Sequence, residues 1–141
     1  MSNSGIGFIG LGQMGLGMAN NLGRVASPFY AYDALSDATN RLSSDNIIIA
    51  SSVSSIAENC HLIFLCLPSA KEVKEVIFGT GGIANSALPN LSIIDTSTID
   101  RTEAIAIHNH LANQGITYAD CPISGLPFRA ADGTLTMMFG G

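Results

Sequence analysis

Short apolar runs alternate along the chain with segments in which apolar residues recur every three or four positions. The apolar or alternating stretches predict strands at 5–10, 28–34, 47–50, 62–68, 91–95 and 116–120. Helical periodicity is clearest over 13–23, where Met14, Met18 and Leu22 share one face. Gly23 is the expected stop of that helix. The chain is therefore predicted to alternate strand and helix.

Two further helix starts are marked by capping residues. Ser69 and Glu72 have the S-x-x-E spacing of a capping box, ahead of an apolar-periodic segment that stops near Gly79. Asp100 precedes another such segment, which Gly115 is expected to end. Both predicted helices link a strand to the next strand, as in a parallel sheet.

This order predicts an α/β fold, a Rossmann-like, doubly wound and mostly parallel sheet with helices on both faces. Residues 1–141 read as a single domain long enough to bury a core. A last strand is predicted at 134–139, antiparallel to its neighbour, because no crossover helix is expected to fit after Gly125. Ligands of such sheets bind at the carboxyl ends of the strands, so the residues after each strand are the candidates for function.

Composition narrows the possible functions. With 47% hydrophobic and 12% charged residues, the chain is predicted to be compact rather than disordered. Its net charge is -5 and its six basic residues are dispersed, which argues against nucleic-acid binding. The apolar runs are too short to cross a membrane, and no basic residue precedes Arg24 as in a targeting signal. A cytoplasmic location is expected.

The cysteines and histidines do not predict a metal site. Cys60, Cys66 and Cys121 are odd in number and form no CxxC pair, so reduced thiols that pack as small apolar residues are expected. His108 and His110 lie two apart on a predicted helix and face different directions. No metal ligand is assigned.

Gly10, Gly12 and Gly15 form a GxGxxG motif between the first predicted strand and the first helix. In a dinucleotide-binding turn, the first glycine permits the tight turn, the second admits the pyrophosphate, and the third packs the helix close to the sheet. The pyrophosphate is then held by free N–H groups at the helix N-terminus, without lysines. A purely structural turn is the alternative.

Asp33 follows the second predicted strand, about 20 residues beyond the glycines, where an acidic residue binds the adenosine ribose. Its carboxylate would repel the 2′-phosphate of NADP, and the next residues, ALSDA, contain no arginine to accept that phosphate. NAD is therefore predicted, with NADP less favoured. A helix-capping role for Asp33 is the alternative.

The ends of the later strands add further candidates. Leu67 and Pro68 can form a wall of the cofactor site, and Ser69 is either a cofactor-binding residue or only a helix cap. Hydroxyls in DTSTID are placed to reach the nicotinamide end. Ser124 and Gly125, in CPISG, offer a hydroxyl and backbone amides to a small carboxylate, although this assignment is open from the residues alone.

Five segments, GFIGLGQMG, LPSAKEV, IDTSTID, DCPISG and GTLTMMFGG, occur in the order typical of one family. With them, the chain resembles the N-terminal domain of the β-hydroxyacid dehydrogenases, the 3-hydroxyisobutyrate dehydrogenase and tartronate semialdehyde reductase group. 6-Phosphogluconate dehydrogenase is a more distant relative. The resemblance implies hydride transfer between NAD(P) and a small 3-hydroxy acid. It implies a cofactor site made by Gly10, Leu11, Gly12, Gln13, Met14, Gly15, Asp33, Leu67, Pro68 and Thr98, and a substrate site at Ser124 and Gly125, with Leu126 beside them.

The chain departs from the family pattern at several positions. Leu126 replaces a usual glycine, Gly17 replaces a common proline, and Glu72 stands where asparagine is frequent. The family's general acid/base is a lysine on the helix that opens a second, helical domain. Lys71 and Lys74 both lie in the SAKEVKEV segment, predicted to be a solvated helix face.

No catalytic residue is therefore assigned, and the chain alone is expected to be inactive, lacking that second domain or a partner in a homo-oligomer. A non-catalytic nucleotide-binding or assembly module is the alternative function.

Overall fold

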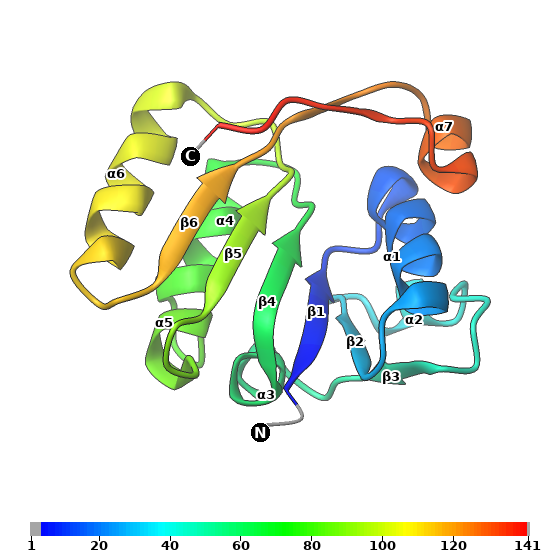
Figure 1. Ribbon diagram of the computed structural model, residues 1–141, viewed down its shortest axis with the longest axis horizontal. Helices are drawn as coiled ribbons and strands as arrows, with labels where there is room; N and C mark the ends of the chain where they lie inside the picture. Colours follow the sequence, from blue (N-terminus) through cyan, green and yellow to red (C-terminus); the bar gives the residue numbers. More distant parts are fainter. Residues whose placement is uncertain (1–3, 141) are drawn as a thin grey trace.

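The computed structural model describes residues 4–140 and contains a six-stranded parallel sheet with the strand order β3-β2-β1-β4-β5-β6 (Figure 1). Its strands are β1 Gly5–Ile9, β2 Phe29–Tyr32, β3 Ile47–Ile49, β4 Cys60–Leu65, β5 Ser92–Asp95 and β6 Thr117–Asp120. The chain winds outward from β1 through β2 to β3, then returns to β4 and winds the other way. The predicted Rossmann-like fold is confirmed.

Helices cover both faces of the sheet, and each face has its own hydrophobic cluster. The helices are α1 Gln13–Val25, α2 Ser36–Thr39, α3 Val53–Asn59, α4 Ala70–Phe78, α5 Ile83–Ser86, α6 Arg101–Ala112 and α7 Pro127–Asp132. On one face, Met18 of α1, Ala38 of α2 and Ala130 of α7 pack with Phe8 and Phe29 of the sheet. The other cluster contains residues of α3, α4, α5 and α6. Both layers are typical of a doubly wound sheet.

The predicted helix boundaries hold in part. Asp100 caps α6 as predicted, because its carboxylate accepts a hydrogen bond from Thr102 N at 2.7 Å. Gly23 does not stop α1. It lies buried inside the helix, where an added Cβ would come within 2.5 Å of Ile47. This glycine permits close packing against β3, a role that a helix-end pattern does not reveal.

The strand predicted at 62–68 is shifted. β4 begins at Cys60 and ends at Leu65, so the residues 66–68 form the loop that leaves the sheet. Since Pro68 has no amide hydrogen, it cannot continue a ladder of hydrogen bonds. The shift places Leu67 and Pro68 beyond the carboxyl end of the strand, where ligands of this fold bind.

The C-terminal part differs most from the sequence prediction. A short helix, α7, does fit after Gly125, and the predicted strand 134–139 is reduced to β8, Thr136–Met137. β8 pairs antiparallel with β7, Ile123–Ser124, in a separate two-stranded sheet, so the predicted antiparallel direction is confirmed. In Figure 1 the segment after β6 crosses the carboxyl edge of the sheet to α7, beside α1, and the chain then runs back.

Candidate dinucleotide-binding site

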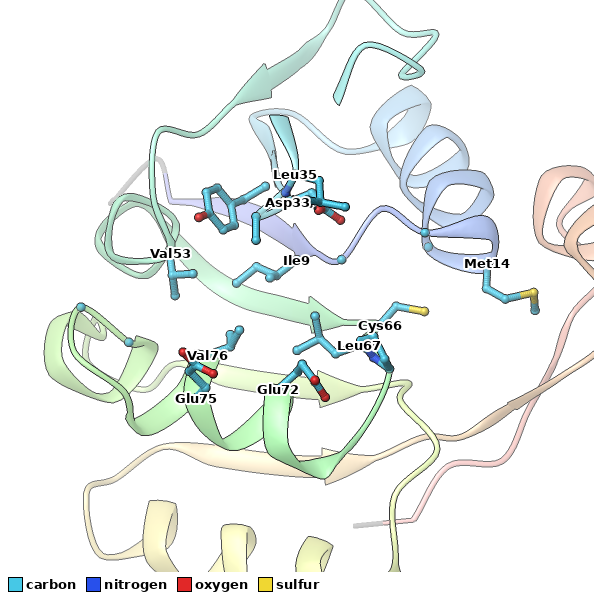
Figure 2. A pocket seen from close by; sticks show the side chains of 18 of the residues that line it. Ile9, Met14, Asp33, Leu35, Val53, Cys66, Leu67, Glu72, Glu75 and Val76 are labelled. Carbon is cyan, nitrogen blue, oxygen red and sulfur yellow. Dashed lines mark hydrogen bonds between the residues drawn. The ribbon is translucent and has the colours of Figure 1, made fainter. Parts of the chain in front are cut away.

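A cavity of about 810 Å³ opens at the carboxyl ends of β1, β2 and β4 (Figure 2). Its volume is within the range of about 300–1,000 Å³ that is usual for small-molecule and cofactor sites. Most of the cofactor residues predicted from the sequence line it: Gly10, Gly12, Gln13, Met14, Gly15, Asp33, Leu67 and Pro68. Leu11, within the glycine loop, is fully buried, while Ser69 and Thr98 are outside the cavity lining.

The three glycines have the geometry that their predicted roles require. Gly10 has a φ of 105°, and a Cβ there would lie 2.1 Å from Cys66 O. A Cβ on Gly15 would lie 1.9 Å from Gly10 O, so this glycine lets α1 approach the turn closely. At Gly12, by contrast, no described atom lies within 4 Å of the added Cβ. The backbone is therefore open at the start of α1, where an anion can approach the free N–H groups.

Asp33 joins the end of β2 to the glycine turn. One carboxylate oxygen accepts a hydrogen bond from Leu11 N at 2.7 Å, and the other accepts from Leu35 N at 2.8 Å. The bond to Leu35 agrees with the capping alternative, but the bond to Leu11 reaches across to the first loop. Each carboxylate oxygen has a second acceptor site. Asp33 is thus held rigidly and can still accept hydroxyl groups at the cavity (Figure 2).

Arg41 lies near this corner, beyond the ALSDA segment on which the prediction against NADP rests. Its Nη2 donates to Leu11 O at 3.1 Å. It also lines a smaller hollow with Leu35 and Ser36 that adjoins the main cavity. Eight residues separate Arg41 from the end of β2, and the intervening α2 turns the chain back toward the glycine loop. No spacing pattern in the sequence predicts that return.

The opposite wall comes from α4. Figure 2 shows Glu72, Glu75 and Val76 on this side of the cavity, facing Asp33 and Leu35 across it. The sequence prediction missed Glu75 and Val76 as lining residues. They could have been found from helical spacing, because residues 72, 75 and 76 recur at three and four positions along one face. Apolar and acidic groups therefore line this side.

Ser69 is the N-cap residue of α4, as predicted, but the capping box is incomplete. The Ser69 hydroxyl donates to the Glu72 carboxylate instead of accepting a bond from a helix amide. This hydrogen bond lowers the pKa of Glu72. Ser69 acts here through Glu72 and fixes the start of the helix that forms the wall.

A buried polar chain lies behind the loop that follows β4. Tyr118 Oη donates to Asp95 at 2.7 Å, and Ser97 N donates to the other Asp95 oxygen at 2.9 Å. Ser97 Oγ in turn accepts from Leu67 N at 2.9 Å. Burial raises the pKa of Asp95, and the bonds from Ser97 and Tyr118 offset part of that rise. The DTSTID segment thus contributes buried supports rather than cavity hydroxyls, while Thr98 is exposed.

The predicted substrate residues lie apart from the cavity. Ser124, in β7, is exposed, as are Gly125 and Leu126 in the turn that follows. Gly125 has a φ of 144°, a conformation that other residues rarely adopt. Large apolar side chains are exposed around them: Leu126, Phe128, Met137, Met138 and Phe139.

Of the lysine and cysteine side chains, Cys66 lines the cavity and the others do not. Lys74 pairs with Glu103 at 2.5 Å, and neither it nor Lys71 lines the cavity. Cys60, Cys66 and Cys121 are free thiols, and burial raises the pKa of Cys60 to about 12. Across residues 4–140, no three His, Cys, Asp or Glu residues lie close enough to hold a metal ion. In the same part of the chain, no helix has the length and apolar character needed to cross a membrane.

Residues 5–141 match the family model of the NAD binding domain of 6-phosphogluconate dehydrogenase. The chain belongs to this family. It is 35% identical over 140 residues to the mitochondrial 3-hydroxyisobutyrate dehydrogenase of Mus musculus, covering 99% of this chain and 42% of that protein. It is 32% identical to the 2-hydroxy-3-oxopropionate reductase of Escherichia coli, covering 96% of this chain and 46% of that protein.

Solved structures agree with this membership. The 3-hydroxyisobutyrate dehydrogenase of Mycobacterium tuberculosis superposes with a TM-score of 0.89 at 28% identity, over 100% of this chain and 47% of that one. The resemblance to the N-terminal domain of the 3-hydroxyisobutyrate dehydrogenase and tartronate semialdehyde reductase group is confirmed. The chain spans less than half the length of these relatives.

Proposed function

We propose that this NAD-binding domain takes NAD in preference to NADP and forms the cofactor half of an oxidoreductase acting on a small 3-hydroxy acid. The observation that carries the proposal is Asp33, held at the edge of the cavity by Leu11 N and Leu35 N with acceptor capacity left for ribose hydroxyls. The bound nicotinamide supplies the hydride chemistry. Gly12 leaves the N-terminus of α1 open for the pyrophosphate.

The preference for NAD follows from charge. A 2′-phosphate would lie next to the Asp33 carboxylate, and two neighbouring negative charges repel each other. Arg41 is nearby, but its guanidinium donates to Leu11 O, so it stabilises the turn beneath the ribose. We expect Arg41 to reduce the repulsion without reversing the preference.

The substrate half of the proposal rests on the relatives and on the exposed surface. Relatives of this chain carry the names of 3-hydroxyisobutyrate dehydrogenase and 2-hydroxy-3-oxopropionate reductase. We propose that Ser124, Gly125 and Leu126 bind the substrate carboxylate once a second, helical domain covers Leu126, Phe128 and Phe139, which are exposed here. That domain would also supply the lysine that acts as general acid/base.

Calorimetry on the 141-residue chain tests the cofactor proposal. NADH is expected to bind at least about tenfold more tightly than NADPH, equivalent to about 1.4 kcal/mol. Asp33→Asn should narrow that ratio, because the amide keeps one acceptor oxygen and loses the charge. Arg41→Ala should weaken NADPH binding more than NADH binding, since NADH loses only the support that Arg41 gives to the glycine turn. Tighter binding of NADPH than of NADH by the unaltered chain would contradict the assignment of Asp33.

A further inference from the structure

The loop between β4 and α4 forms one wall of the cavity, yet the sheet holds it only at its first residue. Cys66 N donates to Ile9 O at 3.0 Å, the last bond from this loop to β1. Pro68 has no amide hydrogen. Leu67 N is therefore the last amide that can anchor the loop before Ser69 starts the helix.

That amide is held by a side chain rather than by a neighbouring strand. Leu67 N donates to Ser97 Oγ at 2.9 Å, and Leu67 itself lines the cavity (Figure 2). The position of this wall thus depends on where the Ser97 hydroxyl lies. A backbone partner would be fixed by the sheet, whereas the position of a side-chain oxygen depends on what holds its own residue in place.

Asp95 fixes the position of Ser97. Ser97 N donates to one Asp95 carboxylate oxygen at 2.9 Å. Tyr118 Oη holds the second carboxylate oxygen at 2.7 Å. All three residues are buried, with exposed fractions of 0% for Asp95, 4% for Ser97 and 2% for Tyr118. Bonds inside a protein gain strength from the low dielectric and polarise one another along a chain.

We infer that Asp95 and Ser97 are positioning residues for the cofactor: through the Leu67 amide they set the β4–α4 wall of the cavity, and Tyr118 orients Asp95 from behind. The inference rests on the proposed binding of NAD at this cavity. Asp95, Ser97 and Tyr118 do not line the cavity themselves. They affect cofactor affinity through a chain of three hydrogen bonds.

Ser97→Ala is the central test, with Thr96→Val as its matched control. Thr96 is buried in the same turn, and its hydroxyl donates to Leu65 O at 2.6 Å. Thr96 N donates to the same oxygen at 2.8 Å, so the backbone link survives the substitution. Both variants remove one buried hydroxyl bond, but only Ser97→Ala releases Leu67.

Ser97→Ala is expected to weaken NAD binding about fivefold, the effect of one hydrogen bond. Thr96→Val should leave NAD affinity within about twofold of that of the unaltered chain. Both variants should lower the melting temperature by a few degrees, to a similar extent. Tyr118→Phe, far from the ligand, should weaken NAD binding about two- to fivefold. Amide hydrogen exchange at Leu67 should accelerate in Ser97→Ala and stay slow in Thr96→Val.

The outcomes separate this inference from the proposed function. If the unaltered chain binds no NAD, both are overturned. If it binds NAD and Ser97→Ala matches Thr96→Val in affinity, the positioning role is overturned and the NAD site stands. If Leu67 exchanges at the same rate in both variants, the bond to Ser97 does not anchor the loop and the inference fails on that ground. Unchanged affinity in Tyr118→Phe would overturn the role of Tyr118 in orienting Asp95.

Discussion

The glycine-loop region, residues 5–33, and the C-terminal segment, residues 121–140, differ in how far their side chains and strands are held by the rest of the fold. In the glycine-loop region, β1 and β2 are paired in the central sheet, and Asp33 is bonded on both oxygens. The C-terminal segment has strands of two residues each, and five of its large apolar side chains are exposed: Leu126, Phe128, Met137, Met138 and Phe139. The first region forms its cavity with the neighbouring loops of the chain, whereas the second presents a surface.

The two halves of the proposed reaction thus have different structural requirements. A dinucleotide needs backbone amides, a carboxylate and apolar walls, all of which meet around one cavity here. A small carboxylate needs desolvated partners, and Ser124 is open to solvent. Substitutions in each region test this contrast.

Gly12→Val should have the largest effect on NAD affinity. The added side chain meets no described atom within 4 Å of its Cβ, so the fold should tolerate it, with the unfolding free energy changed by less than about 1 kcal/mol. The same side chain fills the approach to the helix N-terminus, and binding should weaken at least about 100-fold, or about 2.7 kcal/mol. Calorimetry and thermal unfolding on the same sample measure both.

Gly15→Ala is the counterpart of that test. Its Cβ would lie 1.9 Å from Gly10 O, so loss of binding should come with loss of stability. If Gly12→Val instead bound NAD like the unaltered chain, the pyrophosphate would not lie at the start of α1.

The glycine-loop region was predictable because its function imposes local rules. The spacing of Gly10, Gly12 and Gly15 depends only on neighbouring backbone, and Asp33 follows at a distance that one βα unit fixes. The succession of strands and helices along the chain followed from the alternation of apolar runs. The prediction that failed in this region concerns packing. Gly23 was predicted to end the helix, but it lies inside α1, where it makes room for the side chain of Ile47 on β3.

The C-terminal segment was less predictable because its structure depends on distant contacts. The sequence after Gly125 has no long apolar period, yet α7 forms and rests on α1. Asn21 Nδ2 donates to Ala130 O at 2.9 Å and to Ala131 O at 3.2 Å, from more than 100 residues away. The roles of Asp95 and Ser97 as supports of the β4–α4 wall were missed for the same reason: Tyr118 on β6 and Leu67 in the loop after β4 are more than 20 residues away in sequence.

Gly17→Ala should have the next largest effect, now on the C-terminal segment. In a free helix this change adds about 0.8–1.0 kcal/mol of helix stability. Here the Cβ would lie 2.7 Å from the backbone of Ala130 and Ala131, so the expected result is a loss of about 1–3 kcal/mol of unfolding free energy. NAD affinity should change less than about threefold, because α7 is outside the cavity lining. Chemical denaturation shows whether the unfolding free energy falls or rises, and a rise would show that α7 does not rest on Gly17.

Phe139→Ser should have the smallest effect on this chain. Phe139 is 69% exposed, so the unfolding free energy should change by no more than about 0.5 kcal/mol and NAD affinity should be unaltered. Val25→Ser is the matched control: Val25 is 84% exposed, at the end of α1 and away from the C-terminal apolar group. Binding of an apolar fluorescent dye should fall in Phe139→Ser and not in Val25→Ser, because the dye needs several neighbouring apolar side chains.

Fusing the second half of a related dehydrogenase to this chain would sharpen the same contrast. If that half covers Phe139, as we propose, burial of the ring makes Phe139→Ser cost about 1.5–3 kcal/mol in the fusion, while Val25→Ser stays near zero. Equal costs for the two substitutions would mean that the C-terminal apolar group is not the surface on which the second domain rests, and that Ser124 is completed from another direction.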